Sequence, residues 1–188
     1  MSTQPLTDSE RLLPPHLGGH FGNTNMDERT LHYLIAKHGV RTMIDVGCGP
    51  GGMVDYAKRI DMDAWGIDGD PDAYEHQVVH DYTTGPLTML PVDLIWCTEF
   101  VEHVAAEYQD NYLATFDAGR VLFLTAAPPG FPGHHHVNCQ DASYWIDLLR
   151  LRGWDVDDEA TQWVRNNGGH VFSRRQGLVF TKKSAQSS

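Results

Sequence analysis

Residues 43–52 read MIDVGCGPGG: an apolar run ends in a carboxylate, and a turn dense in glycine follows. Glycine permits a sharp turn and lets a ligand approach the backbone with no Cβ in the way. The helix expected after the turn presents unpaired backbone N–H groups to the same point. The segment therefore predicts a nucleotide-type cofactor site at the end of a first β-strand.

Two classes of cofactor fit the glycine spacing. Gly47, Gly49 and Gly52 satisfy the G-x-G-x-x-G pattern of dinucleotide-binding proteins. Asp45 argues against a pyrophosphate, because a fixed carboxylate two residues before the first glycine would face a group of like charge. The same carboxylate suits a ligand with an ammonium group near the turn, and S-adenosylmethionine has such a group.

The segment DVGCGPG, residues 45–51, resembles motif I of the class I S-adenosylmethionine-dependent methyltransferases. The resemblance extends over residues 40–182 and implies an enzyme that transfers the methyl group of S-adenosylmethionine. A non-catalytic S-adenosylmethionine-binding subunit and an NAD(P)-dependent oxidoreductase remain as alternatives. The residues that the resemblance places at the amino-acid end of the cofactor are Asp45, Gly47, Cys48, Gly49 and Gly51.

Composition narrows the classes of protein and partner. A length of 188 residues, 41% of them hydrophobic and 21% charged, suits one soluble domain with a single core. We expect no membrane span or signal peptide, and the three scattered cysteines favour a reducing cytoplasm over a disulfide framework. A net charge of −11 repels nucleic acid and anionic lipid, so the expected partner is a small-molecule methyl acceptor.

Hydrophobic patterning predicts strands that alternate with helices, and hence a doubly wound parallel sheet of the α/β class. The resemblance adds a C-terminal antiparallel strand pair, which gives a mostly parallel, seven-stranded, Rossmann-like methyltransferase fold. Residues 1–25 are expected to form an arm that serves as a lid, residues 26–183 the single domain, and residues 184–188 a disordered tail. The strands are expected over Thr42–Val46, Ala64–Ile67, Gln77–His80, Val92–Cys97, Arg120–Ala126, Trp154–Val164 and Gly177–Lys182. The helices are expected over Asp8–Leu13, Met26–Lys37, Gly51–Ile60, Phe100–Asp117 and Ala142–Arg152.

Acidic residues follow three of these strands, at the sheet edge where open parallel sheets bind ligands. Asp68, followed by Gly69, is placed to accept hydrogen bonds from both ribose hydroxyls. Asp70 is better explained as a turn-forming residue. Asp81 and Tyr82 match the family position beside the adenine, and Thr98 and Glu99 lie next to the methionine half. For Asp81, a role limited to capping a turn is the alternative.

Glu99, Glu102 and His103 form a Glu-x-x-Glu-His pattern after the fourth strand. At the start of a helix this spacing places the three side chains on one face, where they could hold a divalent metal such as magnesium, manganese, iron or zinc. The pattern resembles the metal motif of some metal-dependent O-methyltransferases. Alternatively, the acidic groups only favour the helix dipole, and Glu99 only orients the cofactor.

A histidine-rich loop offers candidates for catalysis of methyl transfer to an oxygen or nitrogen atom. His134, His135 and His136 follow the fifth strand, and any of them, like His103, could act as a general base or as a further metal ligand. The alternative is that they only satisfy the loop backbone and face solvent. His20, in the arm, could close over the site. The segment Thr98–Val101 lacks the Asp/Asn-Pro-Pro-Tyr/Phe pattern of amino-methylating DNA enzymes.

Overall fold

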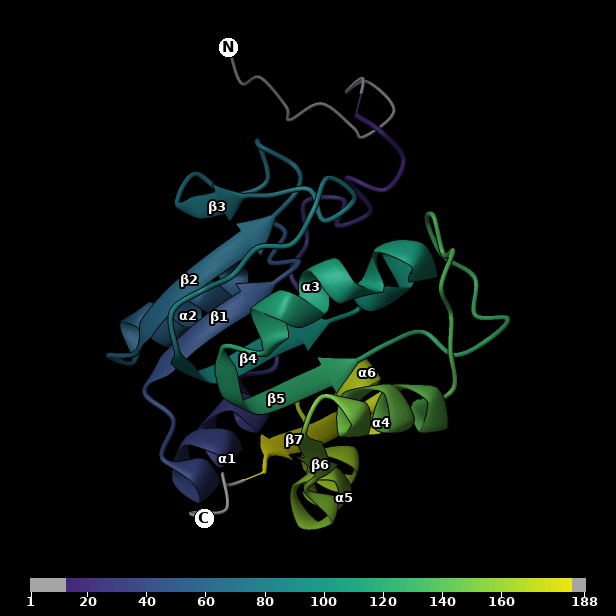
Figure 1. Ribbon diagram of the computed structural model, residues 1–188. Coiled ribbons are helices and arrows are strands. Elements are labelled where there is room, and N and C mark those ends of the chain that lie inside the picture. Colours follow the sequence, from purple (N-terminus) through teal and green to yellow (C-terminus); the bar gives the residue numbers. More distant parts are fainter. Residues whose placement is uncertain (1–12, 184–188) are drawn as a thin grey trace.

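The computed structural model describes residues 13–183, and within them one sheet carries the fold (Figure 1). Its strands are β1 (Thr42–Val46), β2 (Asp63–Asp68), β3 (Gln77–Val79), β4 (Val92–Thr98), β5 (Gly119–Thr125), β6 (Trp154–Val156) and β7 (Leu178–Lys182). They are ordered β3-β2-β1-β4-β5-β7-β6. Strands β1 to β5 pair in parallel, whereas β7 runs antiparallel to both β5 and β6. The expected Rossmann-like α/β sheet with its antiparallel C-terminal strands is confirmed.

Helices cover both faces of this sheet (Figure 1). They are α1 (Glu28–His38), α2 (Gly52–Arg59), α3 (Gln109–Phe116), α4 (Ala142–Leu151), α5 (Asp158–Asn167) and α6 (Val171–Gln176), with the 3-10 turns η1 (Val101–His103) and η2 (Ala106–Tyr108). One apolar cluster joins α3 and α4 to one face, and a second joins α1, α2 and α5 to the other. In β4, Ile95 and Cys97 belong to the first cluster and Leu94 and Trp96 to the second, because alternate residues of a strand point to opposite faces. Burial on both faces explains the continuous apolar run of this strand.

Two expected elements are wrong. The helix expected over Phe100–Asp117 is divided into η1, η2 and α3, because the chain turns at Glu99, with φ at +51°, and is extended again at Val104. The strand expected over Trp154–Val164 ends at Val156. Helix α5 follows, because the Asp157 carboxylate caps it by accepting a hydrogen bond from the Ala160 N–H.

Two expected segments, the helix over residues 8–13 and the tail over residues 184–188, lie outside the described residues except for Leu13, which is not helical. No helix among residues 13–183 is both long enough and apolar enough to cross a membrane.

The sheet order determines where a ligand can bind. Strand β1 lies between β2 and β4, so the chain reverses its direction of progress across the sheet at the β1–β4 boundary. Ligands of open α/β sheets bind beyond the carboxyl ends of the strands at such a switch point. Asp45, near the end of β1, pairs in register with Gly66 of β2 and Trp96 of β4. The residues that follow Val46, Asp68 and Thr98 therefore meet at one edge.

Helix α1 fixes the point from which the N-terminal arm departs. The buried carboxylate of Asp27 accepts hydrogen bonds from the Thr30 N–H at 2.9 Å, the Thr30 hydroxyl at 2.7 Å and the Gly169 N–H at 2.7 Å. The first of these bonds caps the helix, and the last ties its start to the loop that precedes α6. The arm is therefore anchored to the body of the domain at one end.

Candidate functional site

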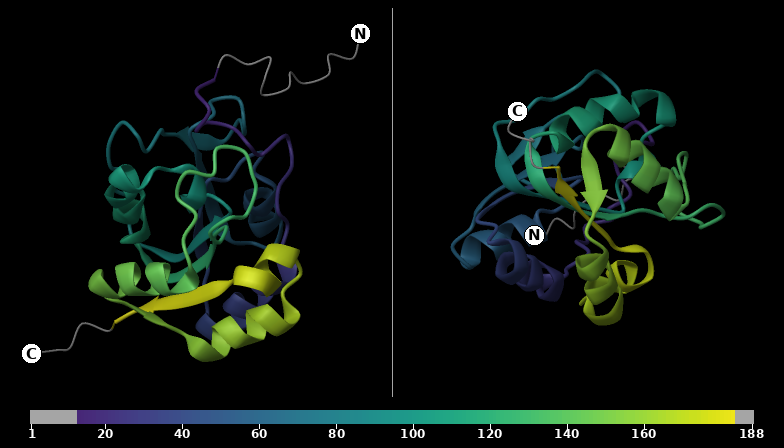
Figure 2. Two further views of the ribbon diagram at one scale, coloured as in Figure 1. Left: turned by 90° about the vertical axis from the view of Figure 1, so that its right-hand side faces the viewer. Right: turned by 60° about the horizontal axis from the view of Figure 1, so that its bottom comes forward.

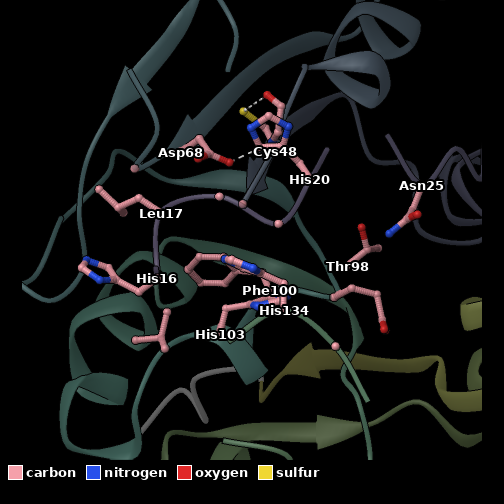
Figure 3. Close-up of a pocket in the computed structure, with 18 of the residues that line it drawn as sticks. His16, Leu17, His20, Asn25, Cys48, Asp68, Thr98, Phe100, His103 and His134 are labelled. Carbon is pink, nitrogen blue, oxygen red and sulfur yellow. Dashed lines mark hydrogen bonds between the residues drawn. The ribbon is translucent and has the colours of Figure 1, made fainter. Parts of the chain in front are cut away.

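A cavity of about 380 Å³ opens beyond the carboxyl ends of β1, β2 and β4 (Figure 3). It is bounded by these strand ends, by the arm over residues 16–25 and by the loop over residues 131–136. Most of the predicted site residues line it: Asp45, Gly47, Cys48, Gly49, Asp68, Gly69, Asp81, Tyr82, Thr98, Glu99, His103, His134 and His136. Three of them do not: Gly51, Glu102 and His135.

The glycine turn has the conformation that its sequence demands. Gly47 has φ at +75° and Gly49 at +48°, a region that side chains disfavour. A Cβ on Gly47 would also lie 2.5 Å from the Phe100 ring. Gly51 is required for a different reason, because it begins α2 with φ at +75° and a Cβ there would collide with Tyr74. The ring of Tyr74 packs against this glycine, which does not line the cavity, so its predicted contact with a cofactor stays a prediction.

Asp45 is a buried carboxyl group at the floor of the cavity, with 3% of its surface exposed. Burial, and secondly the charge of Asp68, raises the pKa of Asp45 to about 8. No residue in the range 13–183 donates a hydrogen bond to it. A positively charged ligand group at this point would favour the ionised carboxylate and so lower its pKa again.

Asp68 holds the glycine turn in place. Its Oδ2 accepts a hydrogen bond from the Gly49 N–H at 2.8 Å, and its Oδ1 accepts one from the Asp70 N–H at 2.9 Å. Each carboxylate oxygen has a second lone pair, so both can still accept a bond from a ligand in the cavity. Asp70 accepts a hydrogen bond from the Asp72 N–H and does not line the cavity, in agreement with a turn-forming role.

Asp81 is engaged by residues from two parts of the chain. Its Oδ1 accepts hydrogen bonds from the N–H and the hydroxyl of Thr83, both at 2.8 Å, and its Oδ2 accepts one from His16 Nε2 at 3.0 Å. Burial raises the pKa of Asp81, but the bonds from His16 and Thr83 outweigh it, so that the pKa lies below the ordinary value. The Tyr82 hydroxyl forms a hydrogen bond with the Thr115 hydroxyl in the core, and the Tyr82 ring makes an edge-to-face contact with Phe100.

The Glu-x-x-Glu-His segment does not form one helix face as predicted, because Glu99 precedes the short turn η1 in a left-handed conformation. The Glu99 N–H donates to the Thr125 carbonyl at 3.1 Å, and Glu99 Oε1 accepts from Gln176 Nε2 at 3.0 Å. Glu99 is therefore held at the rim by β5 and α6.

Three groups are instead brought together from two loops: the ligand atoms of Glu102, His103 and His136 all lie within 4.8 Å of one another. Glu102 is fully buried, and its Oε1 accepts a hydrogen bond from the Ala127 N–H at 3.1 Å. Glu102 Oε2 and His103 Nδ1 are buried without a hydrogen-bond partner among the described residues. Unpaired buried polar atoms are costly, and a cation at this point could satisfy both of them.

The protonation of this group follows from its burial. Burial, and then the charge of Glu99, raises the pKa of Glu102 well above its usual range. Burial, and then His136, lowers the pKa of His103 to about 4. His103 is therefore neutral at pH 7, which is the form that binds a metal ion and is too weak a base to take a proton readily.

The three histidines of the loop have different surroundings. His134 Nε2 donates a hydrogen bond to the Pro15 carbonyl at 2.7 Å, which joins the loop to the arm. His135 lies outside the cavity. His136 packs edge-to-face on His103, with ring centroids 5.0 Å apart. Of the three, only His136 joins the Glu102–His103 group.

The arm forms the outer wall of the cavity, as Figure 3 shows for His16, Leu17 and His20. His16 bonds Asp81, and His20 Nε2 donates a hydrogen bond to Asp70 Oδ2 at 3.1 Å. The Thr24 hydroxyl accepts the Gly52 N–H at 3.1 Å, which satisfies one free donor at the start of α2. The Leu17 side chain packs so closely on Gly69 that a Cβ there would collide with it.

Sequence reasoning missed three contributors to the site. Phe100 packs on Gly47, Gln176 bonds Glu99, and His16 bonds Asp81. Each acts across a long separation in the chain. No pattern in the sequence indicates these contacts, although His16 lies in the same polar arm as His20.

Comparison with known proteins supports the fold through structure rather than sequence. A scan against protein-family models gives no match, and neither does a sequence comparison with curated proteins. Among solved structures, magnesium protoporphyrin IX methyltransferase from Synechocystis PCC 6803, with bound S-adenosylhomocysteine, is 14% identical with a TM-score of 0.59, over 81% of this chain and 80% of that one.

Two further structures have similar scores. The sugar N-methyltransferase KedS8 from Streptoalloteichus sp. ATCC 53650 is 15% identical with a TM-score of 0.61, over 82% of this chain and 85% of that one. A TehB-like methyltransferase from Corynebacterium glutamicum ATCC 13032 Kitasato is 18% identical with a TM-score of 0.56, over 82% and 86% of the two chains. The chain thus has the fold of S-adenosylmethionine-dependent methyltransferases.

The burial of Asp45 predicts a stability that depends on pH. Because its folded-state pKa of about 8 exceeds the ordinary value of 3.8, the group's contribution to stability is full below about pH 4 and falls as the pH rises to about 8. Asp45→Asn mimics the protonated form, and at pH 8 we expect it to raise the free energy of unfolding by more than about 1 kcal/mol, since one pKa unit is about 1.36 kcal/mol. Urea unfolding at pH 4.5 and pH 8 measures this. Equal pH dependence in both proteins would contradict it.

Proposed function

We propose that the protein is an enzyme, an S-adenosylmethionine-dependent methyltransferase that acts on an oxygen or nitrogen atom of a small molecule. The observation that carries the proposal is the meeting of three carboxyl groups with the glycine turn in one cavity. Asp45, Asp68 and Asp81 come from the ends of three adjacent strands and all line this cavity. Such a set suits a ligand with an ammonium group, a ribose and an adenine.

Each end of the cavity would take a different part of the cofactor. Asp45 would face the ammonium group, Asp68 the ribose hydroxyls and Asp81 the adenine amino group, whose bond would then replace that of His16. Thr98 and Glu99 would border the methionine half. When bound, S-adenosylmethionine supplies a methyl group on an already activated sulfonium.

The chain's own contribution to such a transfer is position and exclusion of water. The arm and the loop over residues 131–136 close the outer side of the cavity, and Phe100 packs against its floor. Holding a nucleophile in line with the methyl carbon can lower the barrier by about 7–11 kcal/mol. No large chemical step is required of a side chain beyond the removal of a proton from the acceptor.

The small-molecule assignment rests on charge and on the structural neighbours. With a net charge of −11, the chain repels phosphate backbones. The similar structures include enzymes named for a magnesium porphyrin and for a sugar. Both observations favour a small acceptor over nucleic acid.

Calorimetry with S-adenosylhomocysteine and with NADH tests the cofactor assignment. We expect micromolar binding of S-adenosylhomocysteine, none of NADH, and at least tenfold weaker binding by Asp68→Ala than by the exposed-residue control Asp147→Ala. Transfer of labelled methyl groups from S-adenosylmethionine to a metabolite extract then separates an enzyme from a non-catalytic binding subunit. Tight binding of NADH alone would overturn the proposal.

We also propose that the Glu102–His103–His136 group binds a divalent cation that assists the transfer. The support is local: two buried atoms without partners, three ligand atoms within 4.8 Å and a neutral imidazole. Nitrogen and carboxylate ligands suit zinc, iron or manganese, and the cation would serve to stabilise a negatively charged acceptor oxygen. In this arrangement Glu99 orients the cofactor and is not a ligand.

Metal titration tests this second proposal directly. We expect one Mn²⁺ or Zn²⁺ ion to bind the wild-type protein, and at least tenfold weaker binding by Glu102→Gln and His136→Ala. His135→Ala, which changes a neighbour outside the group, serves as the control. Affinity for S-adenosylhomocysteine should not change in any variant. Absence of metal binding, or full methyl transfer after thorough chelation, would contradict the assignment.

The arm would act as a lid on the bound cofactor. Its histidines reach Asp81 and Asp70 on the sheet side, and His134 reaches back to Pro15 from the loop side. Figure 2 shows this loop, in green, above the edge of the sheet where the purple arm also lies. A ligand enclosed between them leaves only when one of these contacts opens.

Replacement of both arm histidines, His16→Ala with His20→Ala, should speed the release of S-adenosylhomocysteine about tenfold, which corresponds to about 1.4 kcal/mol of lost closure. Stopped-flow displacement measures the dissociation rate. His76→Ala changes an exposed histidine that lies just before β3 and outside the arm, and it should leave the rate unchanged. A rate equal to that of the wild type in the double variant would refute the lid.

A further inference from the structure

A second cavity, of about 290 Å³, lies at the same edge of the sheet, beyond the end of β5. It is bounded by the loop that follows β5, by the start of α4 and by α5 and α6. The residues of this cavity that matter below are Trp145, Arg165, Arg175 and Gln176. Of these four, only Gln176 contacts the first site, through its hydrogen bond to Glu99.

The cavity has an excess of positive charge in an acidic protein. Arg165 and Arg175 both line it, against one carboxylate, that of the exposed Asp141. Arg165 Nε donates a hydrogen bond to the Gly177 carbonyl at 3.0 Å. Within residues 13–183 neither arginine forms an ion pair, whereas basic residues elsewhere, such as Arg120 with Asp93, are paired.

Neutral hydrogen-bond donors accompany the two guanidinium groups. The indole Nε1 of Trp145 is buried and has no hydrogen-bond partner among the described residues. The side-chain amides of Gln140 and Gln176 also border the space. Each already donates one hydrogen bond, to Asn138 and to Glu99, and each carries an acceptor oxygen besides its second N–H. Guanidinium groups present planar, paired donors that match carboxylate and phosphate oxygens. The two arginines are therefore the groups that suit this cavity to an anion.

The second cavity adjoins the first through one contact. Gln176 lines the second cavity, and its Nε2 donates to Oε1 of Glu99, which lines the first. Helix α6 likewise contributes Phe172 to the first cavity and Arg175 to the second. The two cavities therefore share the wall that contains Gln176 and Glu99, and an acceptor that occupies both would pass beside this hydrogen bond.

We propose that this second cavity is the subsite for an anionic group of the methyl acceptor. The inference rests on the proposed methyltransferase function and names its substrate class: a small molecule with a carboxylate or phosphate at some distance from the methylated atom. A local cationic site is needed for such a substrate, because the net charge of −11 otherwise repels it.

Titration with inorganic phosphate and with acetate tests the subsite without any turnover. In ¹H–¹⁵N spectra we expect the Trp145 indole signal to shift and saturate, with affinity at least fivefold weaker in Arg175→Gln. Arg150→Gln removes an exposed arginine that does not line the cavity and should behave as the wild type. No shift with either anion, or equal shifts in all three proteins, would overturn the inference.

Methyl transfer to a metabolite extract, separated by anion exchange, distinguishes this inference from the function on which it rests. We expect labelled product from the retained, anionic fraction, and at least tenfold less from that fraction with Arg175→Gln at unchanged affinity for S-adenosylhomocysteine. Product from the unretained fraction alone would refute the subsite and leave the methyltransferase assignment standing. Failure to bind S-adenosylhomocysteine would refute the assignment and with it the methyl-acceptor subsite, and the anion titration would then show only whether the cavity binds an anion.

Discussion

The burial of Asp45 next to the glycine turn that follows β1 is the constraint on which the rest of the site depends. A carboxyl group at the end of the central strand, without a hydrogen-bond donor among the described residues, lowers stability whenever it is ionised. Folding alone would favour an apolar residue or an amide at this position. The chain keeps a carboxyl group where the strand order also opens a cavity, which is the arrangement expected of a site for a cationic ligand.

The carboxyl-lined half of the site, where a cofactor is proposed to bind, could be placed from the sequence because local sequence specifies it. Strand β1 lies at the residues expected from the sequence, and Asp68 and Asp81 follow strands whose apolar patterns mark their ends. In a parallel sheet these ends converge whatever the helices do. At Gly51 the structure shows a reason that the sequence did not indicate, because a Cβ there would collide with Tyr74. The sequence alone does not distinguish a glycine required by close packing from one required by a ligand.

The Glu102–His103–His136 group and the second cavity could not be predicted, because tertiary packing determines which residues meet there. The break of the chain at Glu99 and Val104 overrides the apolar pattern that favoured one long helix, and it moves Glu102 and His103 toward His136. The helical spacing of Ala160 and Val164 was obscured by the strand-like residues before them, so α5 and α6 were missed together with Arg165 and Arg175. Helix α6 lies far along the chain from the glycine turn, so no sequence pattern near that turn indicates that Arg175 or Gln176 approaches the site.

The carboxyl-lined first cavity and the second cavity differ in charge, and this difference bears on the proposed reaction. The cofactor half is lined by carboxyl groups, which favour a donor with a sulfonium and an ammonium group, and the second cavity is lined by two arginines, which favour an anionic acceptor. Methyl transfer removes the sulfonium charge, so the acidic half binds the spent, neutral thioether less strongly than the donor. The carboxylates proposed to recognise the cofactor would in this way also promote release of its product, at the cost in stability expected for a buried Asp45.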